Sequence, residues 1–359
     1  MSRKNSGKSK ILLWVLSTIA VLMIAAVLAY SLWEQPPEIA EEEPVAETPV
    51  LPEETVAPTP EPMPEGTAFD SGRQDGVYTI LLAGVDLMSG STDTILVGKL
   101  DTVRHTMNFV SIPRDMLINV DWEVRKINSV YIGSKNAGGT GIDSLSIHIR
   151  RTVGFVPDCY AILDINTFIN VIDELGGVDY DVPFEMEYDY WDVNPGERTR
   201  IYLAPGYQHL DGLHAMAVVR NRYGYITGDF GRMEVQQDFM RSCIEQFINA
   251  GTIPHAGAIA EILAENLDTD LSAANIAWFM RQALLCGTEN IHFSSMPADD
   301  CELMGYSYAL PKIYEWIDMI NEQLNPYEDP IGYYSLNVVY WDGSSYKGTV
   351  GLDGDWYYQ

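Results

Sequence analysis

A run of uncharged residues near the amino terminus places the strongest constraint on how this chain can be organised. Residues Ile11–Trp33 carry no charge and are apolar or small with few exceptions. In a helix, at about 1.5 Å per residue, such a run can cross the roughly 30 Å hydrocarbon core of a bilayer. The alternative is a cleaved secretory signal ending near Val27, Leu28 and Ala29, but a signal core usually covers only about 7 to 15 residues. We therefore expect an uncleaved transmembrane helix over residues 11–33.

Charge is distributed unevenly around this run. The 359 residues include 22 lysines and arginines against 51 aspartates and glutamates, which gives a net charge of −29. Four of the basic residues lie within residues 1–10, so the positive-inside rule places this tail in the cytoplasm and everything after Trp33 outside the cell. We expect a single-pass protein of the cell membrane. Its acidic outer part cannot hold nucleic acid by general charge, so nucleic acid is not an expected partner.

Residues 34–76 have the composition of an extended linker. They contain nine of the 19 prolines and ten glutamates, a composition that resists helix formation and cannot bury a core. We expect a disordered spacer that holds the folded part off the membrane. The chain then divides into a cytoplasmic tail (1–10), an anchor (11–33), a linker (34–76), a main domain (77–250) and a C-terminal extension of unknown role (251–359).

Strand and helix patterns alternate after residue 76. Three short β-branched runs, Val77–Val85, Thr94–Leu100 and Thr106–Ile112, predict strands that are covered on both faces. Helical patterns and a fourth strand follow, at Lys126–Ser134, Ile142–Val153, Cys159–Leu163 (the strand) and Asn166–Leu175. This alternation predicts an α/β fold with three layers, α-β-α, around a mixed central sheet.

The residues after 250 predict a small α+β extension. Its expected elements are helices from Pro254, over Ser272–Leu285 and over Leu310–Leu324, with a strand at Ile291–Ser295. The last thirty residues would form either an edge strand pair or a loosely held tail. None of the four cysteines has zinc-ligand spacing, and an exported location would permit a disulfide between Cys286 and Cys301, the pair nearest in sequence.

The residues Val218–Gln237 hold the densest group of charged and amide side chains. Arg220 and Arg222 share a face only on an extended backbone, so we expect the helix that begins near Asp211 to open into an extended segment over Val219–Arg222. Asp229 would then cap a second helix, on which Asp229, Arg232 and Gln236 form one stripe.

Converging guanidinium groups of this kind form a fork-shaped receptor for phosphate or carboxylate oxygens. The alternative is a surface face of salt bridges, but the acidic residues in this stretch do not alternate with the arginines as such a face requires. The pattern favours an anion-binding site.

Further charged residues lie at the ends of the first three predicted strands. Asp86 comes directly after the first strand and Asp93 precedes the second, so a short loop could bring both carboxylates to one hard cation such as Mg²⁺. Ordinary turn chemistry is the alternative for both. Arg114 ends the third strand at the same sheet edge, where it binds an anion or merely neutralises Asp115, and Lys126 follows as a further candidate for substrate binding.

Seven ordered motifs, spread over most of residues 77–250, together resemble the LytR-CpsA-Psr family of cell-wall glycopolymer ligases. They are LLAGVD (Leu81–Asp86), STDT (Ser91–Thr94), SIPRD (Ser111–Asp115), RKIN (Arg125–Asn128), LGGVDYDVP (Leu175–Pro183), LAPGYQHLDGLHAMAVVRNR (Leu203–Arg222) and GDFGRMEVQQ (Gly228–Gln237). The predicted anchor and linker also resemble the family's organisation. The family usually has an arginine two residues before its second aspartate, and this chain has Ser91 there.

The resemblance implies that Asp86 and Asp93 are associated with Mg²⁺, and that Asp229 is an acid beside the substrate. It also implies a set of residues that contact pyrophosphate: Arg114, Arg220, Arg222, Arg232 and Gln236. The implied activity is a phosphotransferase that moves a glycopolymer from a polyprenyl-pyrophosphate carrier to peptidoglycan, with Asp93 or Asp229 accepting the proton of the acceptor hydroxyl and Arg114 neutralising charge. Two alternatives stay open: hydrolysis of the pyrophosphate, and a non-catalytic glycolipid-binding or regulatory protein.

Overall fold

The structure is a computed structural model that describes residues 33–39, 72–86, 90–191, 198–221, 229–247 and 256–352. Within these ranges, no helix is both long enough and apolar enough to cross a membrane. The predicted anchor lies outside them except for Trp33, so the anchor and its orientation stay predictions. The predicted linker is described at its two ends, where residues 34–39 and 72–76 both contact the folded part.

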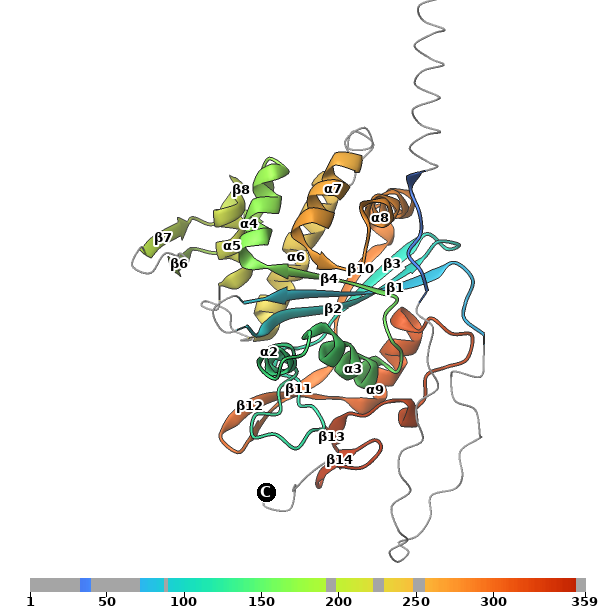
Figure 1. The fold of residues 1–359 in the computed structure, drawn as a ribbon. Coiled ribbons are helices and arrows are strands. Elements are labelled where there is room, and N and C mark those ends of the chain that lie inside the picture. Colours follow the sequence, from blue (N-terminus) through green and yellow to red (C-terminus); the bar gives the residue numbers. More distant parts are fainter. Residues whose placement is uncertain are drawn as a thin grey trace, which may run out of the picture.

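A six-stranded mixed sheet forms the centre of the molecule, with strand order β10-β3-β2-β1-β4-β9 (Figure 1). Strand β1 runs parallel to β4 and β3 runs parallel to β10, whereas the other neighbours are antiparallel. The strands are β1 (Val77–Val85), β2 (Thr92–Asp101), β3 (Thr106–Ser111), β4 (Cys159–Asp164), β9 (Asp268–Thr269) and β10 (Ile291–Ser295). The predicted α/β class and mixed sheet are confirmed.

Helices cover both faces of this sheet (Figure 1). One face carries α2 (Val130–Asn136), α3 (Ile142–Val153) and α9 (Ile313–Met319). The other carries α4 (Ile165–Glu174), α5 (Gly212–Arg220), α6 (Asp229–Phe247), α7 (Ala256–Asn266) and α8 (Ala273–Cys286). Along β1 the side chains alternate between the faces: Leu81 and Ala83 pack under α3, and Ile80 and Leu82 pack under α8.

Four two-stranded sheets surround the central one. They are β5 (Val178–Val182) with β8 (Gly206–Leu210), β6 (Met186–Trp191) with β7 (Arg198–Leu203), β11 (Ala298–Leu303) with β12 (Tyr306–Pro311), and β13 (Val339–Trp341) with β14 (Tyr346–Gly348). The last pair is the strand alternative expected for the final thirty residues. The helix expected from Leu310 was wrong at its start, because Leu310 pairs with Asp299 in the β11–β12 ladder and packs against Leu117; helix α9 begins at Ile313.

The sheet continues across residue 250. Strands β9 and β10 come later in the sequence, yet β9 pairs with β4 and β10 pairs with β3. A residue from α6, Gln237, also reaches across to β10, where its amide donates to the carbonyl oxygen of Ser294 at 3.0 Å. The division into domains at 250 stays a prediction, but the residues on either side of it share one sheet.

The four cysteines are free thiols. Cys286 is buried with Leu96 and Trp278 between α8 and the sheet, whereas Cys301 packs beside Leu117 in a different cluster. Because these two clusters are separate, the pair that is nearest in sequence does not form a disulfide. Burial raises the pKa of the Cys286 thiol to about 11, which keeps this side chain neutral.

Helix α5 is fixed by a close approach to α4. A side chain at Gly212 would collide with the backbone carbonyl of Ile169 in α4, so a glycine is needed there. Asp211 caps the helix by accepting from the backbone N–H of His214 at 2.9 Å. The extended segment expected over Val219–Arg222 was wrong for its first two residues: the buried apolar face of α5 extends the helix through Arg220, and the first extended residue is Asn221.

Candidate active site

The connection between β1 and β2 brings two carboxylates together. Val85 lies opposite Thr92, so Asp86 and Asp93 flank the same turn. The backbone N–H of Asp86 donates to the carbonyl of Ser91 at 2.9 Å, and that of Gly90 donates to the carbonyl of Asp86 at 2.6 Å. Gly90 has φ of 69°, in the left-handed region that favours glycine. The turn therefore holds both acids at the end of β1.

Three arginines from different parts of the chain contact these two aspartates. Arg220, the last residue of α5, forms an ion pair with Asp86, which is only 8% exposed. Arg114 donates from Nη1 to Asp93 Oδ1 at 2.8 Å, and the buried Arg232 of α6 donates from Nη2 to the backbone carbonyl of Asp93 at 3.4 Å. The three guanidinium groups that the sequence placed near one site therefore converge on the two aspartates.

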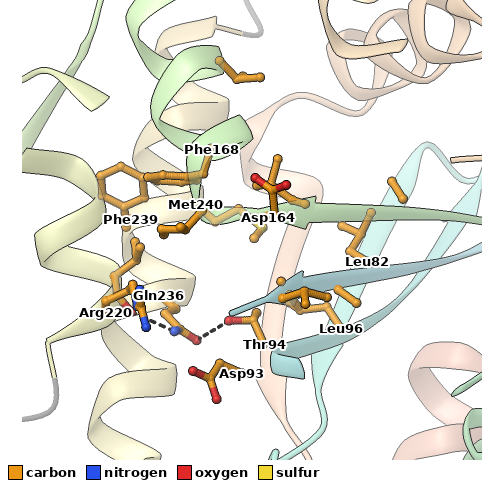
Figure 2. A pocket seen from close by; sticks show the side chains of 18 of the residues that line it. Leu82, Asp93, Thr94, Leu96, Asp164, Phe168, Arg220, Gln236, Phe239 and Met240 are labelled. Atoms are coloured by element: carbon orange, nitrogen blue, oxygen red, sulfur yellow. Dashed lines mark hydrogen bonds between the residues drawn. The ribbon is translucent and has the colours of Figure 1, made fainter. Parts of the chain in front are cut away.

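Gln236 links α6 to helix α5 and to strand β2. Its amide nitrogen donates to the carbonyl of Val219 at 2.9 Å, and its amide oxygen accepts from the hydroxyl of Thr94 at 3.3 Å. Figure 2 shows Gln236 beside Arg220 and bonded to Thr94. Because Arg232 lies one helical turn earlier on α6, these bonds also hold Arg232 against β2.

Lys126 lies beside this group and not inside it. Its Nζ is 3.0 Å from Asp115 Oδ1, whereas Arg114 Nε is 3.9 Å from Asp115 Oδ2. The expected alternative for Arg114, a neutralising pair with Asp115, is therefore weaker than its contact with Asp93. Lys126 compensates Asp115 and leaves Arg114 directed at Asp93.

An apolar cavity of about 350 Å³ extends from the charged group into the protein. Its charged end includes Asp86, Asp93, Arg220, Arg232 and Gln236. Apart from Asp164, which caps α4, mostly apolar side chains from β1, β2, β4, α4 and α6 line the rest, among them Leu82, Leu96, Leu163, Phe168, Phe239 and Met240. Figure 2 shows Phe168 and Met240 toward one end and Asp93, Thr94 and Gln236 toward the other.

Sequence reasoning missed the lining of this cavity and the residue that anchors α6. The side chains of Gln236, Phe239, Met240 and Cys243 all line the cavity. They continue the helical stripe that the sequence analysis ended at Gln236, so extending that stripe would have identified them. Gln237 was also missed: its amide donates to Ser111 Oγ at 2.7 Å, in β3, and this ties α6 to the sheet.

Cys243, the cysteine among the described residues that line the cavity, is not an activated thiol. Burial raises the pKa of Cys243 to about 12, so the thiol stays protonated near neutral pH. Of the remaining predicted site residues, Arg222 lies outside the described residues. Asp229 begins α6, but its side chain is not described. The roles predicted for these two stay predictions.

The two aspartates fit the requirements of a magnesium ion. Mg²⁺ in phosphate-handling sites is commonly held by one or two carboxylates, with waters and substrate oxygens completing its coordination. Asp86 and Asp93 supply such a pair at the charged end of the cavity. Over the part of the chain that the structure describes, no group of three or more His, Cys, Asp and Glu side chains could hold a metal by itself. Water and substrate oxygens would supply the further ligands of a metal bound there.

Comparison with known proteins gives one consistent relationship. The profile of the LytR_cpsA_psr family matches residues 52–325. The polyisoprenyl-teichoic acid–peptidoglycan teichoic acid transferase TagV of Bacillus subtilis is 32% identical over 203 residues, which are 54% of this chain and 50% of TagV. The regulatory protein MsrR of Staphylococcus aureus is 28% identical over 57% of this chain and 59% of MsrR. The chain thus spans only about half of the length of these relatives.

The same relationship is found among solved structures. The crystal structure of B. subtilis TagV superimposes with a TM-score of 0.59 at 27% identity, and it covers 69% of this chain and 96% of the TagV chain. The fold, the order of the motifs and the family profile therefore agree. This chain belongs to the LytR-CpsA-Psr family.

Proposed function

We propose that this protein is a membrane-anchored, extracytoplasmic phosphotransferase that moves a glycopolymer from a polyprenyl-pyrophosphate carrier to peptidoglycan, forming a phosphodiester. The supporting observation is the junction between a cluster of arginines and an apolar cavity. A polyprenyl pyrophosphate has the same division, because a charged headgroup is joined directly to a long hydrocarbon. The similarity to TagV, which is named a teichoic acid transferase, supports the same reaction class.

The arginines would bind the pyrophosphate by exchanging partners. In the structure Arg220 pairs with Asp86 and Arg114 pairs with Asp93, so these guanidinium groups are held in place by carboxylates. A bound pyrophosphate offers the same kind of oxygen in larger number, and bidentate guanidinium contacts to phosphate are strong and directional. Mg²⁺, when bound at Asp86 and Asp93, would neutralise part of the charge on the phosphates.

The proposed reaction forms one bond to phosphorus and breaks one. The oxygen of an acceptor hydroxyl on peptidoglycan bonds to the phosphorus that carries the glycopolymer. The bond from that phosphorus to the bridging oxygen breaks, and polyprenyl phosphate leaves with the bridging oxygen and its electron pair. The hydroxyl proton passes to a carboxylate, Asp93 or Asp229. Arg114, Arg220 and Arg232 stabilise the charge that builds up on the phosphate oxygens.

A transfer assay with the full-length protein tests this function. The protein is incubated with a polyprenyl-pyrophosphate-linked glycan, peptidoglycan fragments and Mg²⁺, and both products are measured. We expect a phosphodiester-linked conjugate and an equal amount of polyprenyl phosphate. Arg232→Ala should lose most of this activity, whereas Arg104→Ala, a surface arginine that pairs with Asp101 away from the cavity, should retain it.

Water in place of the acceptor would give hydrolysis, which is the second candidate. In that case polyprenyl phosphate would appear without the conjugate, and peptidoglycan fragments would not change the rate. A non-catalytic glycolipid-binding or regulatory role is the third candidate. Ser91 in place of the family's usual arginine favours it. The relative MsrR, which is named a regulatory protein, favours it as well. Binding of the donor that depends on Arg114 and Arg220, with no product of either kind, would replace the enzyme proposal with this one.

A further inference from the structure

The residues that directly follow the predicted anchor dock onto helix α8. The backbone N–H of Gln35 donates to the carbonyl of Ala274 at 3.4 Å. The side chain of Asn275 donates to the carbonyls of Gln35 and Pro36, both at 3.0 Å. Asn275 also belongs to the capping box of α8, so the docking site is a rigid helix end. In Figure 1 this segment lies beside α8.

A buried ion pair makes the docking specific. The Glu34 side chain is 1% exposed, and its Oε2 lies 3.2 Å from Nη1 of Arg281, which is 50% exposed. Its other oxygen, Oε1, makes no hydrogen bond within the described residues. A carboxylate is costly to bury without an opposite charge, so the burial of Glu34 depends on Arg281.

The docked segment lies on the same face of the sheet as the cavity. Helix α8 packs through Trp278 onto Leu96 and Leu82, and both of these leucines also line the cavity. Because Glu34 directly follows Trp33, the last residue of the predicted anchor, such an anchor would join the domain at α8. Without docking, residues 34–76 could extend to roughly 130 Å at about 3.1 Å per residue, and the domain could lie far from the bilayer.

We propose that residues 34–37 are a docking segment that holds the cavity-bearing face of the domain, through α8, against the lipid bilayer. This inference rests on the proposed function and on the predicted anchor, and it names the bilayer as the partner of the α7–α8 face. The described residues at the far end of the expected linker are also attached to the folded part, because Gly72 accepts from the backbone N–H of Glu328 and the backbone N–H of Gln74 donates to Pro326. The lipid chain of a donor would then reach the cavity from the membrane while the domain stays in place.

Disulfide trapping in membranes tests the docking. Full-length protein with Cys243 and Cys301 replaced by Ser carries Gln35→Cys and Ala274→Cys, and it is oxidised mildly in native membranes. The matched control pairs Gln35→Cys with Glu315→Cys, an exposed position on α9 on the opposite face of the sheet. We expect rapid cross-linking of the first pair only. Equal rates for the two pairs, or none for the first, would overturn the docking.

Charge reversal tests the ion pair. Arg281→Glu should lower the cross-linking rate about tenfold, equivalent to about 1.4 kcal/mol, because it places two like charges together. Adding Glu34→Arg should restore the rate, and Lys312→Glu, the same charge change on the far side of the sheet, should leave it unchanged. An Arg281→Glu variant that cross-links at the parent rate would contradict the assignment.

Energy transfer to labelled lipid tests the orientation. Dyes are attached to the full-length protein in vesicles at Glu265→Cys on α7 or Glu315→Cys on α9, both exposed positions. We expect stronger transfer from position 265, and a smaller difference after Arg281→Glu. Equal or absent transfer at the two positions would overturn the orientation. None of these measurements uses a glycan donor. A failure of the docking proposal can therefore be told apart from a failure of the proposed transfer activity.

Discussion

The two faces of the central sheet are built from the same strands but packed in different ways. On one face, α2, α3 and α9 close completely over Leu81, Val97 and Val110, and the cluster there includes the fully buried Trp316. On the other face, Leu82 and Leu96 border a cavity of about 350 Å³ between the sheet and its helices. Adjacent residues of one strand, such as Leu81 and Leu82, therefore have different roles. The closed face supplies stability, and the open face gives up packing to leave room for a ligand.

Neighbouring leucines on β1 test this contrast most strongly. Leu81→Ala empties a filled site, so we expect the free energy of unfolding to fall by about 3 to 5 kcal/mol. Leu82→Ala enlarges a space that is already open, and we expect a loss of about 1 to 2 kcal/mol. Denaturant unfolding of the two variants measures the difference. Equal losses would mean that the two faces are packed alike.

The closed face should also be sensitive to acid through His148 on α3. Burial first and Arg151 second lower the pKa of His148 to about 4 in the folded protein, against about 6.5 in the unfolded chain. The unfolded state therefore takes up this proton first as the pH falls. His148 therefore leaves the free energy of unfolding unchanged above about pH 6.5. As the pH falls from about 6.5 to about 4, the free energy of unfolding decreases, and below about pH 4 this decrease levels off.

Unfolding measurements at pH 7 and pH 4.5 isolate this effect. Between them His148 should account for about 2 to 3 kcal/mol of the lost stability of the parent, since one pKa unit corresponds to about 1.4 kcal/mol. His148→Gln cannot take up the proton and should lose less stability over the same interval. If parent and variant lose equal amounts, His148 is not buried in its neutral form.

The charged end of the open face should affect ligand binding and leave folding nearly unchanged. We expect Arg220→Ala to weaken binding of a polyprenyl pyrophosphate by about 1.5 to 3 kcal/mol, the range for hydrogen bonds to charged groups. Arg220→Lys should recover only part of this, because the two-pronged geometry is lost. Calorimetric titration measures both. Parent-like affinity in a folded Arg220→Ala variant would remove Arg220 from the binding site.

A gain of function at position 91 is the smallest expected effect. Ser91 follows Gly90 in the turn between the two aspartates, and its hydroxyl lies 3.5 Å from Asp93 Oδ1. Ser91→Arg would add a guanidinium group beside that turn, and we expect donor affinity to rise by up to about tenfold. Ser91→Gln is the neutral control of similar length. Equal affinity in both variants would show that a charge at 91 cannot reach the phosphates.

The sequence predicted elements with continuous or periodic apolar runs better than short polar strands. Strands β1 and β10 and helix α3 have the predicted bounds, because continuous or periodic apolar runs reflect burial directly. Strand β11 (Ala298–Leu303) was not predicted, because it is short and acidic. Its pairing with β12 depends on a turn that hydrophobic periodicity does not reveal. The extended backbone predicted at Arg220 was also wrong, because packing of the buried face of α5 extends the helix to this residue.

The candidate site was predictable in its charged half alone. Arginines and aspartates are rarely needed for packing. Their clustering in Val218–Gln237 and around Asp86 and Asp93 therefore indicated a binding site. The cavity was not, because a leucine or phenylalanine that lines a cavity has the same sequence pattern as one that fills a core. Phe168 and Phe239 come from α4 and α6, and only the fold shows that a space separates these helices from the sheet.

The most direct test of the central claim compares binding with turnover in Asp93→Asn. This change keeps the size of the side chain and removes the charge that pairs with Arg114 and is proposed to hold Mg²⁺. If the open face is a catalytic site, the loss should fall mainly on the transition state. We predict that the variant binds the lipid-linked donor within about tenfold of the parent, or about 1.4 kcal/mol, and loses most of its transfer activity. Transfer at the parent rate by Asp93→Asn, or a loss of binding that accounts for the whole loss of activity, would contradict a catalytic role for this site.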